Sequence, residues 1–502
     1  MMDGGMGGMN GNMGMMGSKK NPYSQDTVGL PLAKESQIVE LKDGENYQMT
    51  AQIVAKEING NKVKMLAYNG MIPGPFLKVA RGSTITINFT NETDEEALLH
   101  SHGVRLKNAF DGTNLTQNPI PIGGSFTYEI TFPDTGIYWY HPHLREDYTQ
   151  EFGLYGNYLV QSEDPDYWSP VNRELPLVLD DLILENGQIA SFSKDQADHA
   201  LMGRYGNTML VNGETDYQLR LTKGEVIRLY ITNVSNVRPY QFSIPNIKMK
   251  LVGGDASKVE QETFVESIII VPSERAVLEA YFPESGEYQL LNKNPELTTK
   301  LGTVVVSEEQ VDVSYIDQFN IDRTNSDVIA DIDPFRKYFD RPYDKSLELT
   351  LQMGMMNGSM ENMMMGSEPH KIEWEDDMGH MNANSTSDMI TWKLVDQATG
   401  KANMDIDWTF KMGEVVKVRL FNNPDSNHPM HHPIHLHGQR FLVLETNGER
   451  NKNLVWKDTA LVQAGDTVDI LVEMSNPGKW MLHCHISEHL EADMMLGFEV
   501  LP

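Results

Sequence analysis

The sequence predicts an all-β protein built from three β-sandwich domains. Its 502 residues suit three units of roughly 150 residues each. Short runs of alternating apolar and polar residues recur along the chain, separated by Gly, Pro and Asn turns, and this pattern is typical of sandwich strands. The strongest indication is an internal repeat, because one strand motif occurs three times.

The repeat consists of two motifs per domain. A glycine turn followed by an alternating strand occurs at residues 82–91, 224–233 and 413–422. A second motif places a glycine five residues before His141, Leu291 and His483 in the three copies. The middle copy also has Lys293 where the other copies have a second histidine. We therefore expect the middle domain to bind no metal at this position and to act as a spacer.

Composition sets the expected domain boundaries. Residues 1–20 form a tail rich in methionine and glycine that we expect to be disordered. The first domain is predicted at 21–165 and the middle domain at 166–310. Residues 311–345 have mixed charges and few strand signals, so we interpret them as a linker. The third domain is predicted at 346–502, with a methionine-rich insert at about 353–389.

The third domain contains the only cysteine of the chain, in the stretch His483-Cys484-His485 followed by His489 and Met494. A single cysteine cannot form an internal disulfide bond. A thiolate with two imidazoles and a weak axial thioether is the ligand set of a blue-copper electron-transfer site. On a strand, residues two apart share a face, so His483 and His485 point away from Cys484. One short segment could therefore serve two metal centres.

The other histidines are clustered in the same way. Ten of the fifteen lie in four tight groups, which are His100 with His102, His141 with His143, His432 with His435 and His437, and His483 with His485 and His489. One isolated pair would be an ordinary solvated feature of a strand. Four groups, one of them around the only cysteine, indicate metal ligation. Zinc is the rival, but one cysteine with ten histidines and a spaced methionine fits copper better.

These clusters resemble those of the multicopper oxidases, specifically the bacterial three-domain laccases and cuprous oxidases. The resemblance extends over nearly the whole chain, since residues 68–75 (YNGMIPGP) and 456–459 (WKDT) are also similar to family sequence. It implies three cupredoxin-like Greek-key β-sandwich domains. It also implies four copper ions, one of type 1, one of type 2 and two forming a type 3 pair. The first and third domains would meet, with the copper cluster between them.

The resemblance assigns every copper ligand to a residue of this sequence. The type 1 copper would be held by His432, Cys484 and His489, with Met494 in the axial position. The type 2 copper would be held by His100 and His435. In the type 3 pair, one copper would be held by His102, His141 and His485, and the other by His143, His437 and His483.

The sequence matches only part of the set of acidic residues that supply protons to the cluster in the family. Asp111 matches the acidic residue that family members place near the cluster. Just after the last type 1 histidine, however, this chain has Leu490 where many bacterial relatives have a glutamate. The proton route of those relatives therefore cannot be assigned in full to residues of this chain. Glu488 and Glu491 are candidate substitutes, as is Asp493, and spacing does not choose among them.

Leu490 also bears on the reducing substrate. Cuprous oxidases have carboxylates at the positions of Leu490 and His428, and these carboxylates hold the incoming copper ion. Met430 is the only residue of that copper-binding site that is the same in this chain. We interpret His428 and His431 as solvated loop residues, with a rebuilt metal-docking patch as the alternative. An apolar rim at Leu490 favours aromatic rings, so phenols and aromatic amines are the expected substrates and Cu(I) is the alternative.

Methionine is over-represented in two places, the first sixteen residues and the insert. Thioethers select Cu(I), and related cuprous oxidases have a methionine-rich insert in a similar place. Met355, Met356 and Met360 are therefore candidate contacts for Cu(I) or for the substrate. The other interpretation is a flexible low-complexity segment.

The expected activity is a laccase-type oxidation. A reducing substrate would lose single electrons at the type 1 copper, and the trinuclear cluster would reduce O2 to water. A copper-sequestering scaffold is the non-catalytic alternative, although a scaffold has no need of the Cys484 bridge. Nitrite reductase is disfavoured because it does not need the paired type 3 histidines.

Charge and hydropathy limit the partners. With 71 acidic and 41 basic residues, the chain repels nucleic acid and favours cations near its surface. No stretch approaches the length of a membrane span, and no secretory signal is visible at the N-terminus. We therefore expect a monomer without membrane or nucleic-acid partners, in the cytoplasm rather than exported.

Overall fold

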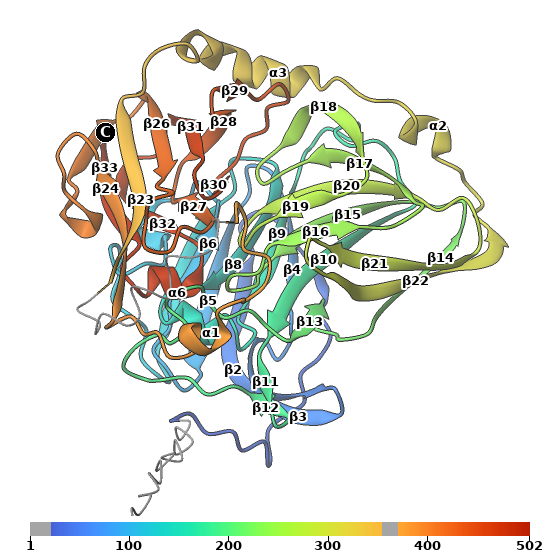
Figure 1. Cartoon of the computed structure of the whole chain (residues 1–502). Coiled ribbons are helices and arrows are strands. Elements are labelled where there is room, and N and C mark those ends of the chain that lie inside the picture. The colour runs from blue at the N-terminus through green and yellow to red at the C-terminus, as the bar shows by residue number, and fades with distance from the viewer. Residues whose placement is uncertain (1–21, 354–369) are drawn as a thin grey trace, which may run out of the picture.

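The computed structural model describes residues 22–353 and 370–502. The predicted disordered tail, together with Met355, Met356 and Met360, lies outside the described residues. Nearly all regular structure is β, with 48% strand and 8% helix, so the predicted fold class is confirmed. Figure 1 shows the first domain in blue and cyan, the middle domain in green, and the third domain in orange and red.

The first domain has two sheets that pack on one apolar core. One has the order β3-β2-β5-β7 and contains β2 (Asn46–Ile58), β3 (Asn61–Tyr68), β5 (Thr84–Glu92) and β7 (Ser125–Thr131). The other has the order β1-β4-β9-β8-β6 and contains β1 (Ile38–Leu41), β4 (Phe76–Ala80), β6 (Leu99–His102), β8 (Gly136–Pro142) and β9 (Gly156–Gln161). Two short helical turns, η1 (Asn108–Phe110) and α1 (Glu146–Thr149), lie in its loops.

The middle domain repeats this plan. Its first sheet has the order β13-β10-β15-β20-β17-β18, with β10 (Arg173–Leu182), β13 (Thr208–Val211), β15 (Val226–Asn233), β17 (Lys248–Gly253), β18 (Lys258–Val265) and β20 (Arg275–Tyr281). Its second sheet has the order β14-β22-β21-β16-β19, with β14 (Tyr217–Lys223), β16 (Tyr240–Ser243), β19 (Ile268–Ile270), β21 (Gly286–Lys293) and β22 (Thr298–Gln310). A small hairpin joins β11 (Leu184–Glu185) to β12 (Gln188–Ile189).

The third domain also has two sheets. One has the order β24-β23-β26-β31-β28-β29, with β23 (Lys345–Met353), β24 (Ile390–Asp396), β26 (Val415–Asn422), β28 (Arg440–Thr446), β29 (Glu449–Arg450) and β31 (Thr467–Glu473). The other has the order β25-β33-β32-β27-β30, with β25 (Trp408–Lys411), β27 (His432–Leu436), β30 (Thr459–Val462), β32 (Gly478–Cys484) and β33 (Met495–Leu501). Its helical turns are α5 (Gly379–Asn382), η3 (Asn403–Asp405) and α6 (Ser487–Leu490).

The segment between the middle and third domains is helical. It contains α2 (Ile316–Phe319), α3 (Ser326–Ile332) and η2 (Asp333–Tyr338), and α3 packs against β18. Figure 1 shows this gold segment running along the edge of the middle domain to the start of β23. The sequence predicted a linker with few strand signals at 311–345, and the structure shows that it contains these short helices.

The sequence repeat corresponds to equivalent strands. β5, β15 and β26 each pair in parallel with an earlier strand, which is β2, β10 and β23 respectively. Each also pairs antiparallel with a later strand, which is β7, β20 and β31. The second motif forms β8, β21 and β32 at equivalent places in the other sheets. The ligand-bearing strands β8 and β32 are therefore structural counterparts in the outer domains.

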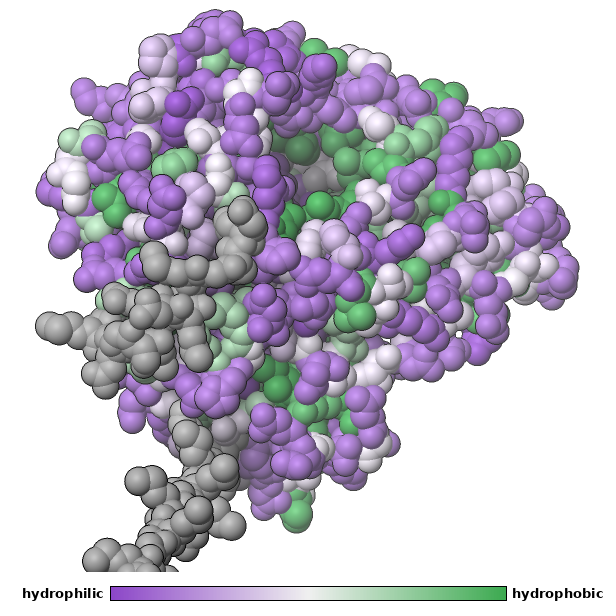
Figure 2. Space-filling model, in the orientation of Figure 1, coloured by the Kyte–Doolittle hydropathy of each residue, from purple (hydrophilic) through white to green (hydrophobic). Residues whose placement is uncertain are grey.

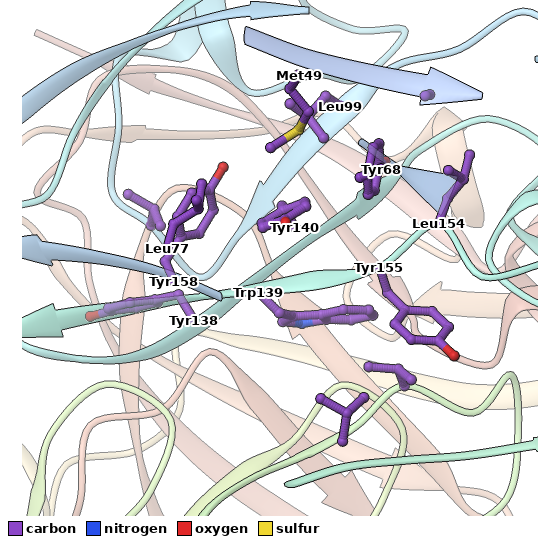
Figure 3. Packing of buried hydrophobic residues seen from close by; sticks show 14 of the residues in the cluster. Met49, Tyr68, Leu77, Leu99, Tyr138, Trp139, Tyr140, Leu154, Tyr155 and Tyr158 are labelled. Atoms are coloured by element: carbon purple, nitrogen blue, oxygen red, sulfur yellow. The ribbon is translucent and has the colours of Figure 1, made fainter. Parts of the chain in front are cut away.

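Strand β8 shows how core packing positions site residues. Tyr138, Trp139 and Tyr140 are all buried, and Figure 3 shows them among the aliphatic and aromatic side chains of the first domain. The Tyr140 hydroxyl donates to the carbonyl oxygen of Pro75 at 2.6 Å. The Trp139 ring stacks on His141 with a centroid distance of 4.1 Å. The core thus fixes the direction in which the next histidines of the strand point.

The face of the molecule in Figure 2 is mainly polar. Figure 2 shows a largely hydrophilic face with scattered apolar residues, in keeping with a net charge of −30. In the described ranges, no helix is both long enough and apolar enough to span a bilayer.

Candidate metal centres

Four strands carry most of the clustered histidines. β6 pairs with β8, and this register puts His100 opposite His141. In the third domain β27 pairs with β32, and His435 lies opposite His483. All four of these histidines are buried. The ring centroids of His100 and His435 are 5.9 Å apart, so the fold brings together side chains that are more than 300 residues apart in the sequence.

One cluster surrounds the cysteine. The Sγ atom of Cys484 lies 3.5 Å from Nδ1 of His432 and 3.8 Å from Nδ1 of His489. These three residues form a group whose ligand atoms all lie within 4.8 Å of one another. Met494 is buried beside them, and its carbonyl oxygen accepts a hydrogen bond from the Cys484 amide. Two imidazoles and a thiol thus converge, as a mononuclear copper site requires.

The second cluster contains the eight remaining histidines of the four motifs. His143, His437 and His483 form one compact group, and His100, His102 and His141 form another. His100 also groups with His435 and His437. The ring of His485 lies 4.9 Å from His102 and 5.0 Å from His141. The structure thus brings all eight predicted trinuclear ligands into one buried site between the first and third domains.

Most of these imidazoles have one partnered ring nitrogen and one unpartnered nitrogen. Nδ1 of His100, His141, His435 and His483 contacts a backbone carbonyl oxygen at 2.6 to 2.8 Å. In the described part of the chain, Nε2 of His100, His141, His143 and His435 and Nδ1 of His102 have no hydrogen-bond partner. Buried nitrogens without partners are rare and costly. Because their other nitrogens are held, the free nitrogens point into the site and are available to a metal.

The protonation states also suit metal binding. Burial lowers the pKa of His102, His141, His143, His435 and His483 well below the ordinary histidine value, and the neighbouring imidazoles lower it further. The rings are therefore neutral, which is the form that binds metal. Burial raises the pKa of the Cys484 thiol, so a bound cation is needed to stabilise the thiolate there.

The two clusters are joined by three consecutive residues. Cys484 faces His432 and His489, while its neighbour His483 has Nε2 only 3.0 Å from Nε2 of His437. The other neighbour, His485, packs near His102 in the same cluster. This is the alternation that strand geometry predicts for residues on opposite faces. A few covalent bonds connect the thiol with the second cluster.

Asp111 lies beside the second cluster, as expected from the sequence. Its carboxylate accepts a hydrogen bond from Nδ1 of His437 at 3.1 Å, and its backbone oxygen contacts Nδ1 of His100 at 2.6 Å. Burial alone would raise its pKa, but the interactions with His437 and His100 outweigh burial and lower it. Asp111 is therefore an ionised group that orients two of the candidate ligands.

The other predicted acidic residues are placed differently. Glu488 is buried, one oxygen accepts from the Asn236 amide at 3.0 Å, and burial raises its pKa to about 8. Burial, together with the charge of Asp147, raises the pKa of Glu491 to about 7. Asp493 is exposed. In the described ranges, none of these three carboxylates forms a hydrogen bond or an ion pair with a cluster histidine.

Glu146 was not predicted from the sequence. Its Oε1 atom lies 3.2 Å from Nδ1 of His143, and the side chain is fully buried on α1, which packs against α6. Among the described residues, neither carboxylate oxygen has a hydrogen-bond partner. The only signal in the sequence was its spacing, three residues after His143. An i,i+3 spacing on a four-residue helix is too common to select a residue.

Two expectations about the type 1 surroundings are wrong. His428 and His431 are not solvated, because they are 8% and 0% exposed and their Nε2 atoms lack partners in the described residues. Leu490 is 6% exposed, so it does not form an open apolar rim. Met430 is completely buried. His431 is covered by the chain at Glu373, whose amide donates to Nδ1 of His431 at 3.3 Å, and the sequence did not reveal this contact.

We call residues 197–204 of the middle domain the cover segment. Its backbone binds the third domain, since the Leu201 amide donates to Ser385 Oγ and the Ala200 oxygen accepts from the Trp392 indole, both at 2.9 Å. Trp392 in turn stacks on His489 with a centroid distance of 4.2 Å. His432 and His489 are both 0% exposed. Neither ring therefore reaches the protein surface, and Trp392 lies against both of them.

Three family models described as multicopper oxidase match this chain, at residues 50–165, 176–309 and 375–502. The multicopper oxidase of Staphylococcus epidermidis is 26% identical over 460 residues, which is 90% of this chain and 87% of that protein. Laccase-1 of Cryptococcus neoformans is 25% identical, over 95% of this chain and 83% of its own length.

Solved structures agree in fold. The laccase-like multi-copper oxidase of Ochrobactrum sp. superposes with a TM-score of 0.72 at 22% identity. The match covers 94% of this chain and all of the other. It supports the three-domain cupredoxin-like architecture.

Proposed function

The chain belongs to the multicopper oxidase family, and from that premise we propose that it couples the oxidation of a reducing substrate to the reduction of O2 to water. The observation that supports this most is the stretch from His483 to His485, whose side chains reach two separate buried clusters. A copper-storage protein has no need of such a link. An oxidase that separates electron entry from O2 reduction does need it.

We propose one mononuclear and one trinuclear copper site. His432, Cys484 and His489 would hold the first, with Met494 beside them. The trinuclear ligands would be His100 and His435 for type 2 copper, and His102, His141, His485, His143, His437 and His483 for the type 3 pair. When bound, the copper ions supply the one-electron redox chemistry and the O2 chemistry that amino-acid side chains lack.

The residues of the chain have three tasks in this proposal. The neutral imidazoles keep one nitrogen on a backbone or carboxylate partner and turn the other towards the cluster. The peptide and side-chain bonds between Cys484 and its neighbours provide the electron path. Asp111 remains ionised and holds His437, and its charge favours the arrival of protons at the site.

For the reducing substrate we favour Cu(I) over aromatic donors, on the basis of the type 1 surroundings. Three potential copper ligands, His428, Met430 and His431, are buried near His432, and two of them have unpartnered Nε2 atoms in the described ranges. Imidazole and thioether groups suit Cu(I). The covered rings of His432 and His489 leave no contact surface for a phenol. Phenols and aromatic amines are the second candidate, because relatives of this chain include proteins named laccase.

The function is tested by O2 uptake of copper-loaded protein with Cu(I) or 2,6-dimethoxyphenol as donor. We expect wild-type uptake with at least one donor, and none with Cys484→Ser, although this variant should retain trinuclear copper. His428→Ala should lower turnover of Cu(I) more than turnover of the phenol, whereas the exposed His380→Ala should change neither. No O2 uptake with either donor would contradict an oxidase, and equal losses in His428→Ala would contradict Cu(I) as substrate.

A further inference from the structure

A side chain of the copper-free middle domain reaches the proposed trinuclear site. Arg275 begins β20 and is 2% exposed. Its guanidinium forms a two-pronged ion pair with Asp458 of the third domain, in which Nη1 donates to Oδ1 at 2.7 Å and Nη2 donates to Oδ2. A planar guanidinium paired in this way fixes the orientation of the carboxylate.

Asp458 in turn touches two candidate copper ligands. Its Oδ1 accepts a hydrogen bond from Nε2 of His102 at 3.0 Å, and its backbone oxygen contacts Nδ1 of His435 at 2.8 Å. Because Nε2 of His102 is occupied, Nδ1 is the nitrogen left for copper, and Nδ1 has no partner among the described residues. Asp458 therefore selects the ligating nitrogen of His102 and holds the ring of His435.

Arg275 is itself held by the first and middle domains. Its Nε donates to the carbonyl oxygen of Ile137 on β8 at 3.0 Å, and Nη1 donates to that of Ser273 at 2.8 Å. Its backbone amide donates to Asp255 at 2.8 Å. One buried side chain thus contacts all three domains, and the contact with the third domain leads directly to the copper ligands.

The residue after His102 is adapted to this arrangement. Gly103 has φ +80°, a conformation that favours glycine. A Cβ atom at this position would clash with the Asp458 carboxylate and lie 3.0 Å from Nη2 of Arg275. Only glycine allows the ion pair to approach the end of β6 so closely.

We propose that Arg275 is a positioning residue of the trinuclear copper site, acting through Asp458 on His102 and His435. The middle domain is then a structural part of the copper site and more than a spacer. This inference rests on the proposed function, since it requires copper at these histidines. Without the guanidinium, the buried Asp458 carboxylate loses both prongs of its ion pair and keeps only the hydrogen bonds from Thr459 and His102, so His102 is oriented less firmly.

The test compares Arg275→Gln with a matched control, Arg228→Gln. Arg228 is also buried in the middle domain and pairs with Glu279 at 2.8 Å and Glu174 at 2.6 Å, but neither partner contacts a candidate ligand in the described ranges. Both variants should destabilise the copper-free protein. Only Arg275→Gln should lower copper affinity at the trinuclear site, by about 10-fold or more, as measured by competition with a chelator.

Electron paramagnetic resonance gives an independent readout on the copper-loaded proteins. A coupled pair of Cu(II) ions is silent, so misplacement of His102 should increase the fraction of copper that is detected in Arg275→Gln. The blue absorption of the mononuclear site should stay unchanged. Arg275→Lys keeps the charge but loses one prong, and should give an intermediate signal.

Three outcomes decide the matter. Equal destabilisation of both variants, with unchanged copper affinity and resonance spectrum, would show that Arg275 only stabilises the fold and would overturn the proposal. If Arg275→Gln does not fold, Arg275→Lys and Asp458→Asn are compared with Arg228→Gln instead. Copper binding like that of the wild type in both variants would also overturn the proposal. A wild-type protein that binds no trinuclear copper would instead refute the proposed function.

Discussion

At the scale of single residues, the candidate ligands are distinguished by what holds their second nitrogen. Backbone oxygens hold His100, His141, His435 and His483, and carboxylates hold His102 and His437. A partner on one nitrogen fixes both the tautomer and the direction of the ring. The two carboxylates, Asp458 and Asp111, are therefore as important for the site as the imidazoles they touch.

Asp111→Asn should weaken the trinuclear site without affecting the mononuclear one. The amide cannot provide the negative charge that faces His437 at 3.1 Å. We expect kcat to fall by about 10- to 100-fold. The blue absorption of the mononuclear site should be retained. Steady-state kinetics and the visible spectrum check this, and a variant with wild-type kcat would contradict the role of Asp111.

Glu373 gives the copper-free protein a specific pH dependence. Burial, with repulsion from Asp377 and Glu296, raises its pKa from 4.5 to about 8. The unfolded chain releases this proton near pH 4.5, whereas the folded chain keeps it until about pH 8. Between these two pH values the folded state binds more protons than the unfolded state. The contribution of Glu373 to stability therefore falls as pH rises from about 4.5 to about 8.

Glu373→Gln should abolish the loss of stability that Glu373 causes as the pH rises. The free energy of unfolding of the variant, relative to wild type, should increase steadily across that pH range. Denaturant unfolding of copper-free protein at several pH values measures it, with the exposed Glu57→Gln as control. A difference that does not vary with pH would refute the shifted pKa.

The ligand residues could be predicted from sequence because they cluster locally, around one cysteine and in four short motifs. The residues that position them could not. Arg275 is 173 residues from His102 in the sequence and acts through Asp458, which lies in another domain. Glu146 is near His143 in sequence, but only the structure shows that its carboxylate is buried 3.2 Å from Nδ1 of His143 on a helix that packs against α6. Tertiary contacts of this kind leave no periodic pattern.

At the scale of elements, the repeat predicted the strands well because alternation and glycine turns are local signals. It identified β5, β15 and β26, and also β8, β21 and β32. The cover segment was not predicted, because its backbone groups bind Ser385 and Trp392, and such contacts leave no pattern in the sequence. His431 is buried by a different segment, since its Nδ1 accepts a hydrogen bond from the Glu373 amide.

Asn382→Ala should loosen the cover segment. The Asn382 side chain accepts from the Met202 amide at 3.0 Å and donates to the Gly203 oxygen at 2.8 Å, and both bonds are lost in alanine. We expect a stability loss of about 1–3 kcal/mol. The kcat/KM for a phenol should rise, because the mononuclear site becomes more accessible. Asn384→Ala, two residues away and exposed, is the control, and an unchanged kcat/KM in Asn382→Ala would show that the cover does not limit access.

At the scale of the whole molecule, the outer domains meet at the proposed trinuclear site, and the middle domain holds them through Arg275 and the cover segment. Figure 1 shows strands β6 and β8 of the first domain beside β27 and β32 of the third. Ligands donated by two domains crosslink distant parts of the chain when copper binds. Metal binding and domain association are therefore coupled.

Removal of copper should consequently lower the midpoint of thermal unfolding. We expect a decrease of about 5 °C or more, since a ligand that binds only the folded state stabilises it by about 3 kcal/mol at 100 times its dissociation constant. Calorimetry before and after chelation measures the change. Cys484→Ser, which keeps the trinuclear ligands, should retain most of the stabilisation. Identical midpoints with and without copper would contradict the crosslink between domains.

The central claim is that electrons enter near Cys484 and leave to O2 at the histidine cluster beside it. The most direct test is the ratio of donor oxidised to O2 consumed, measured with a peroxide assay on copper-loaded wild type and Cys484→Ser. We expect four electrons per O2 without peroxide in the wild type, and no turnover in the variant. Peroxide released in proportion to O2, or turnover that survives the loss of the thiol, would contradict it.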